Sequence, residues 1–100
     1  MVEINWTKQA VQDIDKIAEF IAKDSDHYAK IQVQRFFNSV KILERQPRSG
    51  KIVPEKQDPL IRELLIGSYR IIYKILSSTK IDVLTVHHNK RMLSNNPGLK

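Results

Sequence analysis

Cysteine is absent from this sequence of 100 residues. The chain therefore has no disulfide framework, no thiolate nucleophile and no cysteine-based zinc site. Long hydrophobic runs are also missing, since none approaches the roughly 18–20 residues that a membrane span requires. The first residues lack the basic start and apolar core of a signal peptide. We expect a cytoplasmic protein that contacts no membrane and needs no metal or other cofactor.

Acidic residues are scarce in the second half of the chain. Residues 1–50 carry eight Lys and Arg against seven Asp and Glu, a net charge of +1. Residues 51–100 carry nine against four, a net charge of +5. A basic half favours an anionic partner, such as nucleic acid or an acidic protein surface. Net charge also keeps small proteins soluble, so charge alone does not separate these interpretations.

Length and composition predict one domain. The chain is 41% hydrophobic and 28% charged, which is an ordinary globular mixture. A chain of this size can bury one modest core and no second substrate domain. We expect a single domain over residues 1–100, with an ordered core at about 2–93 and a frayed tail at 94–100.

The first half of the chain changes from strand to helix periodicity. Alternating apolar residues over 2–6 predict a short, half-buried strand. Thr7 is typical of a helix N-cap, and apolar spacings of three and four then predict a helix over about 7–23. After a polar break the same period returns over 27–46. The short connection predicts an antiparallel helix hairpin, whose two apolar stripes need a common surface.

The second half of the chain has the period of strands. Residues 47–59 hold three of the four prolines and are predicted to form an ordered loop. Alternation then predicts strands over 61–66, 69–76 and 81–88. The pair Gly67-Ser68 is typical of a two-residue hairpin turn, with glycine at the first position of a type II′ turn.

The predicted order is β-α-α-β-β-β, an α+β fold with the helix hairpin on one face of a mostly antiparallel four-stranded sheet. The other face of the sheet is then partly open. Strict alternation places Arg70 and Ile72 on the same face of the sheet. It also places His87 on the same face as Val83 and on the opposite face from His88. The sequence leaves open which set faces the helices.

Several local strings occur in a familiar order along these elements. They are Trp6-Thr7 with Ala10, Asp13 and Ile14; Gln46-Pro47-Arg48-Ser49-Gly50-Lys51 with Val53-Pro54-Glu55; Arg62-Glu63-Leu64; Gly67-Ser68-Tyr69-Arg70-Ile71-Ile72-Tyr73; and Val86-His87-His88 with Arg91. Over about residues 2–93 the chain resembles the RelE/ParE superfamily of bacterial type II toxins, and ParE-like members more closely. The resemblance implies a growth-inhibiting toxin, associated with plasmid stabilisation, that a small antitoxin wraps and silences.

The resemblance implies two alternative targets. RelE-like members cleave messenger RNA on the ribosome, whereas ParE-like members inhibit DNA gyrase. In a metal-independent nuclease the neighbouring 2′-hydroxyl would attack, and side chains would transfer protons and stabilise charge. The catalytic candidates, for a nuclease only, are Arg62, Arg70, His87 and His88. The candidates for binding the target or nucleic acid are Lys51, Arg62, Arg70, Lys90 and Arg91.

Each candidate also has a structural interpretation. Arg62 could pair with Glu55 or Glu63, while the lysines are expected to be solvated. Adjacent strand residues point to opposite faces, so at most one of His87 and His88 can reach a given site. The other would be a hydrogen-bonded, half-buried histidine.

Two further expectations concern the basic half. Tyr69 and Tyr73 share one strand face and could stack on bases, although such residues are more often core. Arg70 is expected to be exposed, so that its loss would cost little stability.

The sequence past His88 lacks a dense set of Lys, Arg and Tyr, and this absence favours an inhibitor that binds its target over an endoribonuclease. An inactive toxin is a third interpretation. The expected partners are a cognate antitoxin and either DNA gyrase or the ribosome with mRNA, with assembly into a toxin dimer or a heterotetramer with the antitoxin.

Overall fold

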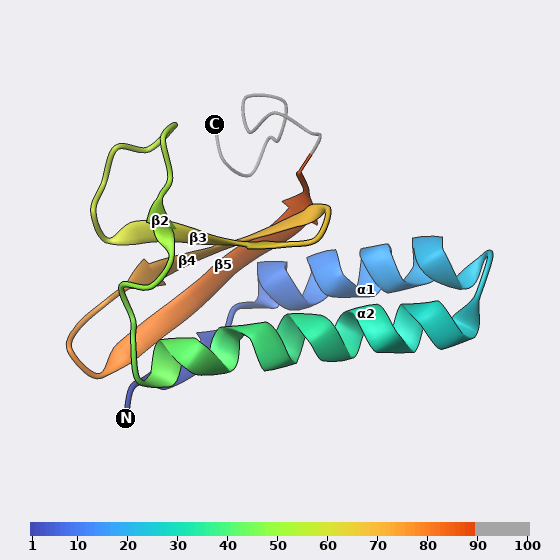
Figure 1. Cartoon of the computed structure of the whole chain (residues 1–100), viewed down its shortest axis with the longest axis horizontal. Coiled ribbons are helices and arrows are strands. Elements are labelled where there is room, and N and C mark those ends of the chain that lie inside the picture. The colour runs from blue at the N-terminus through green and yellow to red at the C-terminus, as the bar shows by residue number, and fades with distance from the viewer. Residues whose placement is uncertain (90–100) are drawn as a thin grey trace.

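The computed structural model describes residues 1–89 as a helix hairpin packed against one face of a sheet (Figure 1). The α+β class and the hairpin predicted from the sequence are confirmed. The elements are β1 (Glu3–Trp6), α1 (Lys8–Ala22), α2 (Asp26–Ser39), the 3-10 helix η1 (Val40–Glu44), β2 (Lys51–Ile52), β3 (Ile61–Ile66), β4 (Tyr69–Ile75) and β5 (Lys80–His88).

The sheet has five strands, in the order β1-β5-β4-β3-β2. β1 runs parallel to β5, and the other neighbours are antiparallel. The prediction of four strands was wrong because it assigned β2 to the loop at 47–59. β2 pairs only Lys51 with Glu63 and Ile52 with Arg62. Two residues are too few to show alternation, so this strand depends on its partner in the sheet.

The second predicted helix is two elements. The α-helix ends at Ser39, whose hydroxyl donates to the Phe36 carbonyl at 2.8 Å, and the chain continues as a 3-10 helix to Glu44. Val40 and Leu43 are both buried there, and their spacing of three residues matches the period of a 3-10 turn. A single helix reaching residue 46 was therefore wrong in its last turns.

The main core lies between the helix hairpin and the sheet. Apolar side chains of α1, α2 and η1 meet those of β4 and β5 there, which explains the two apolar stripes of the hairpin. Its buried members are Val2, Ala10, Ile14, Phe36, Val40, Leu43, Ile71, Tyr73, Ile75, Ile81, Val83 and Val86. The interpretation of Tyr73 as a core residue is confirmed.

A bulge in β5 decides which face each of its last residues joins. Tyr73 pairs with Val83 while Ile72 pairs with Thr85, so Leu84 is an extra residue. Beyond the bulge Val86 lies in the helix-facing core, only 1% exposed. Strict alternation, which grouped His87 with Val83, was therefore wrong.

The opposite face of the sheet, called here the outer face, is covered in part by the chain between β2 and β3. Residues 53–60, the strap, lie on the side away from the helices (Figure 1). Val53 and Ile72 are fully buried between strap and sheet, with Ile61 and Leu84 packed against them. This second small core identifies the open face that the sequence left undecided.

Two polar side chains attach α1 to β5. Thr7 caps α1 by accepting from the Ala10 amide, and its hydroxyl donates to the Val83 carbonyl at 2.7 Å. Asp13 Oδ2 accepts from Thr85 Oγ1 at 2.5 Å and from the Val86 amide at 3.1 Å. Because β1 pairs with β5 only as far as Val83, Asp13 supplies an acceptor where the strand pairing has ended.

Candidate functional site

Arg70 is the centre of a charged cluster on the outer face. Its Nε donates to Glu63 Oε2 at 2.8 Å, and its Nη2 also contacts that oxygen. Its Nη1 and Nη2 reach the Glu55 carboxylate of the strap at 3.3 and 3.4 Å. Arg70 thus connects β4, β3 and the strap.

The cluster is unequally buried. The side chains of Arg70 and Glu63 are 9% and 8% exposed, whereas that of Glu55 is 41% exposed. Burial alone would lower the pKa of Arg70, but the bonds to Glu55 and Glu63 outweigh it and raise that pKa. The hydrogen bond from Arg70 in turn lowers the pKa of Glu55. Arg70 and Glu55 are therefore both charged at neutral pH.

The expectation that Arg70 is exposed was wrong. The strap covers it, and two carboxylates hold it in place. The pairing with Glu63 was detectable in principle from the predicted turn. A two-residue loop at Gly67-Ser68 sets Glu63 opposite Ile72, and therefore diagonal to Arg70 on the same face.

His87 lies beside Arg70 on the outer face, because β5 pairs His87 with Arg70. The residue is only 8% exposed. Burial, together with the neighbouring Arg70 charge, lowers the pKa of His87, and the nearby carboxylates offset this in part. The folded protein therefore favours the neutral imidazole.

His88 lies on the helix side of the sheet. Its ring meets Tyr69 edge to face, with centroids 5.3 Å apart, and Tyr69 packs in the same way on Phe36 at 5.2 Å. The prediction that the two neighbouring histidines reach opposite faces is confirmed.

Arg62 is committed to the backbone of the loop around it. Its Nε donates to the Pro59 carbonyl at 2.8 Å, and its Nη1 donates to the carbonyls of Arg48 and Gly50 at 3.2 and 3.0 Å. The alternative that Arg62 pairs with Glu55 or Glu63 was wrong, because both carboxylates bind Arg70. Arg62 also pairs with Tyr73 in the register of the sheet, which places its side chain on the helix side.

The buried hydroxyl of Tyr73, a residue that the sequence suggested as core or as a stacking surface, holds the same loop. Tyr73 Oη donates to the Pro47 carbonyl at 2.7 Å and accepts from the Gly50 amide at 3.0 Å. A Cβ atom at Gly50 would lie 2.6 Å from both Tyr73 Oη and the Glu63 carbonyl. The glycine is therefore required by this close approach.

The remaining candidates are not gathered into one site. Lys51 is exposed on β2 at the edge of the sheet. Lys90 and Arg91 lie outside the described residues, as does the predicted tail at 94–100. Over residues 1–89 no three potential metal ligands cluster, and no helix there is long and apolar enough to cross a membrane.

The described residues thus form a small α+β domain, with a helix hairpin on a mixed sheet and a charged cluster on the β3–β4 hairpin. A family model described as "ParE toxin of type II toxin-antitoxin system, parDE" matches residues 4–93. The chain therefore belongs to the ParE toxin family.

Comparison with solved structures agrees on the fold. A chain from a structure titled "Chromosomal ParDE TA system from P. aeruginosa" matches with a TM-score of 0.72 and 22% sequence identity, over 88% of this chain and 96% of that chain. Among curated proteins there is no match.

Proposed function

We propose that this ParE-family protein is a cytoplasmic toxin that stops growth by binding a target such as DNA gyrase, and that a cognate antitoxin neutralises it. The choice of binding over RNA cleavage rests on one observation: the four candidate residues for a nuclease lie on two opposite faces of the sheet. Arg70 and His87 occupy the outer face, whereas Arg62 and His88 occupy the helix side.

Metal-independent RNA cleavage requires several side chains to reach the same phosphate group of the RNA. A base must reach the 2′-hydroxyl, an acid must reach the departing 5′-oxygen, and a cation must lie over the same phosphate. Side chains on opposite faces of one sheet cannot contact one phosphate together. Each arginine is moreover already bound: Arg70 to two carboxylates and Arg62 to three backbone carbonyls. This arrangement supports binding over cleavage.

The proposal of an antitoxin partner rests on the family and on the surface. The similar solved structure is titled as a ParDE system. In this chain large apolar side chains remain exposed on the helix hairpin and on the sheet, and the most exposed of them lie on the helix hairpin. Among residues 1–89, those most exposed besides Met1 are Phe20, Tyr28, Leu65, Leu76 and Ile42. Such surface is suited to a partner that covers it, and the basic half favours an acidic one.

Two parallel assays of the purified chain test this function. We expect inhibition of gyrase supercoiling and no ribosome-dependent cleavage of mRNA. His88→Ala should change inhibition by a modest factor only, since no proton transfer depends on it. Cleavage of mRNA, lost by a factor of about 10² or more in a well-folded His88→Ala variant, would instead make the protein an endoribonuclease.

A further inference from the structure

A hollow opens at one end of the longest axis of the molecule, at the left in Figure 1. It has a volume of about 370 Å³ and lies between the loop before β2, the end of the strap and the turn after β4. Leu60 and Leu76 line it and are both exposed, and Pro47 and Ile75 add apolar surface. Among the described residues, Arg48 alone brings charge to this lining. The hollow is therefore an apolar site with a single cation.

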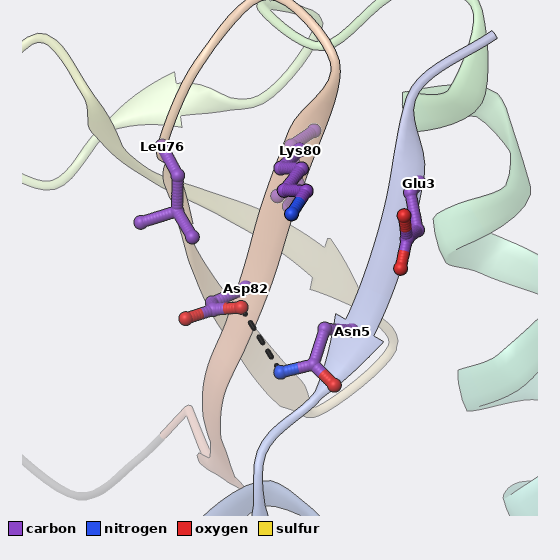
Figure 2. Close-up of a pocket in the computed structure, with 6 residues that line it drawn as sticks. Glu3, Asn5, Leu76, Lys80 and Asp82 are labelled. Atoms are coloured by element: carbon purple, nitrogen blue, oxygen red, sulfur yellow. Dashed lines mark hydrogen bonds between the residues drawn. The ribbon is translucent and has the colours of Figure 1, made fainter.

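The surface continues past Leu76 into a smaller hollow of about 220 Å³ with a different charge. Figure 2 shows Leu76 beside Lys80 and Asp82 of β5. Glu3 and Asn5 lie across from them on β1, where Asn5 donates a hydrogen bond to Asp82 at 3.0 Å. This smaller hollow has two carboxylates and one lysine. Leu76 therefore separates the cation of the larger hollow from a surface that is negative on balance.

The walls of the larger hollow are held by hydrogen bonds to β4. The Pro47 carbonyl accepts from Tyr73 Oη at 2.7 Å, and the Leu60 carbonyl accepts from the Ile75 amide at 2.8 Å. Two loop segments are thus fixed on a central strand of the sheet. A site that is already formed loses less conformational entropy when a partner binds.

The opposite end of the longest axis carries an exposed aromatic side chain. The turn between α1 and α2 lies there, at the right in Figure 1, and Phe20 belongs to the last turn of α1 beside it. Phe20 is 68% exposed, more than any other large apolar side chain in residues 2–89. An aromatic side chain that enters a pocket is a typical anchor of a protein interface.

Phe20 has one acid and one base beside it. Glu19 precedes it in the chain, and Lys23 Nζ lies 5.9 Å from the centre of its ring. Both ion pairs found in residues 1–89 belong to Arg70, so Glu19 and Lys23 belong to no ion pair there. The two charges are therefore available to a partner.

The two ends of the molecule are complementary in polarity and in charge. Phe20 matches the apolar hollow. Glu19 can pair with Arg48 on one side of that hollow, and Lys23 can pair with Asp82 on the other side. A partner of one charge sign, such as nucleic acid, would meet a like charge on one of these sides. The mixed charges therefore favour a second copy of this chain.

The position of the two surfaces sets the symmetry of such an association. Because they lie at opposite ends, a two-fold axis would bring two hollows or two aromatic side chains together. A head-to-tail contact pairs unlike surfaces and leaves one of each free on the outermost copies, so that further copies can add. The contact is small beside the roughly 800 Å² per partner of a standard interface, so the association is weak.

We propose that copies of this chain associate head to tail, with Phe20 of one copy inserted between Leu60 and Leu76 of the next. Glu19 and Lys23 then pair with the charges on the two sides of the hollow. This association covers the most exposed aromatic side chain in residues 1–89. It does not depend on the target or on the antitoxin of the proposed function.

The first test is sedimentation of the purified full chain over a wide range of concentrations. We expect the average mass to rise with concentration beyond that of a dimer, and Phe20→Ser and Leu76→Ser each to weaken self-association about tenfold. Tyr28→Ser is the control for Phe20, because Tyr28 is 66% exposed but lies on α2. Leu65→Ser is the control for Leu76, because both are 49% exposed and Leu65 lies outside the hollow.

The second test mixes variants. Phe20→Ser keeps an intact hollow and Leu76→Ser keeps an intact aromatic anchor, so an equimolar mixture should form a one-to-one complex and no larger species. A charge exchange tests the polar contact. Arg48→Glu and Glu19→Lys should each weaken self-association, and the double variant should restore it, because the two charges are then exchanged.

Several results would overturn the proposal. They are a wild-type chain that stays monomeric, association that stops at a dimer, association that survives Phe20→Ser and Leu76→Ser, and a variant mixture that stays monomeric. Thermal melts verify folding, and Leu60→Ser replaces Leu76→Ser if that variant unfolds. Assays of gyrase inhibition by the same variants are separate, so failure here leaves the proposed function untouched.

Discussion

Replacing Arg70 with alanine should destabilise the fold severely. The substitution leaves the Glu63 carboxylate, whose side chain is 8% exposed, without its cation. It also removes the ion pair by which Glu55 attaches the strap to β4. Removing one member of a buried ion pair typically costs about 3–5 kcal/mol. A domain of this size is stable by only about 5–15 kcal/mol, so a large share of the stability is lost.

Related variants separate the two ion pairs. Glu55→Gln should lower the free energy of unfolding by at most about 1 kcal/mol, because that carboxylate is largely exposed and screened by water. Arg70→Leu combined with Glu63→Leu should be far less destabilising than Arg70→Ala alone, since no buried charge is left unpaired.

Urea unfolding followed by circular dichroism measures all three variants. An Arg70→Ala protein within about 0.5 kcal/mol of wild type, the range of ordinary surface substitutions, would refute the reasoning. Loss of toxicity at unchanged stability would then identify Arg70 as a functional contact.

Three further predictions concern stability. Gly50→Ala should lower the free energy of unfolding in urea by about 1–3 kcal/mol, because its Cβ would overlap Tyr73 Oη. Tyr73→Phe should partly relieve this cost in the double variant, and additive effects of the two substitutions would argue against the overlap. Because the pKa of folded His87 lies below its ordinary 6.5, the unfolded chain binds the proton first and the melting temperature should fall as pH drops from 7.5 to 5.5. His87→Asn should flatten this slope, and an unchanged slope would contradict the assignment. Thr7→Ala should cost about 1–2 kcal/mol by loss of the cap and of the bond to Val83, whereas Thr7→Ser should restore most of it.

Local sequence signals determined much of the fold. The cap at Thr7, the apolar spacing of α1 and the Gly67-Ser68 turn each depend on residues close together in the chain. The predicted helix at 7–23 is observed at Lys8–Ala22, and Gly67 has φ +59°. The turn also fixed the register of β3 against β4, because a two-residue loop allows one pairing.

Only the tertiary structure decided which residues meet across the sheet. The bulge at Leu84 reverses the faces of the residues after it, so the neighbours of His87 could not be read from alternation. Arg62 binds three backbone carbonyls, and the alternation of side chains gives no sign of carbonyl positions. Burial of Arg70 depends on where a proline-containing strap folds back, and such long-range contacts are set by packing and not by local periodicity.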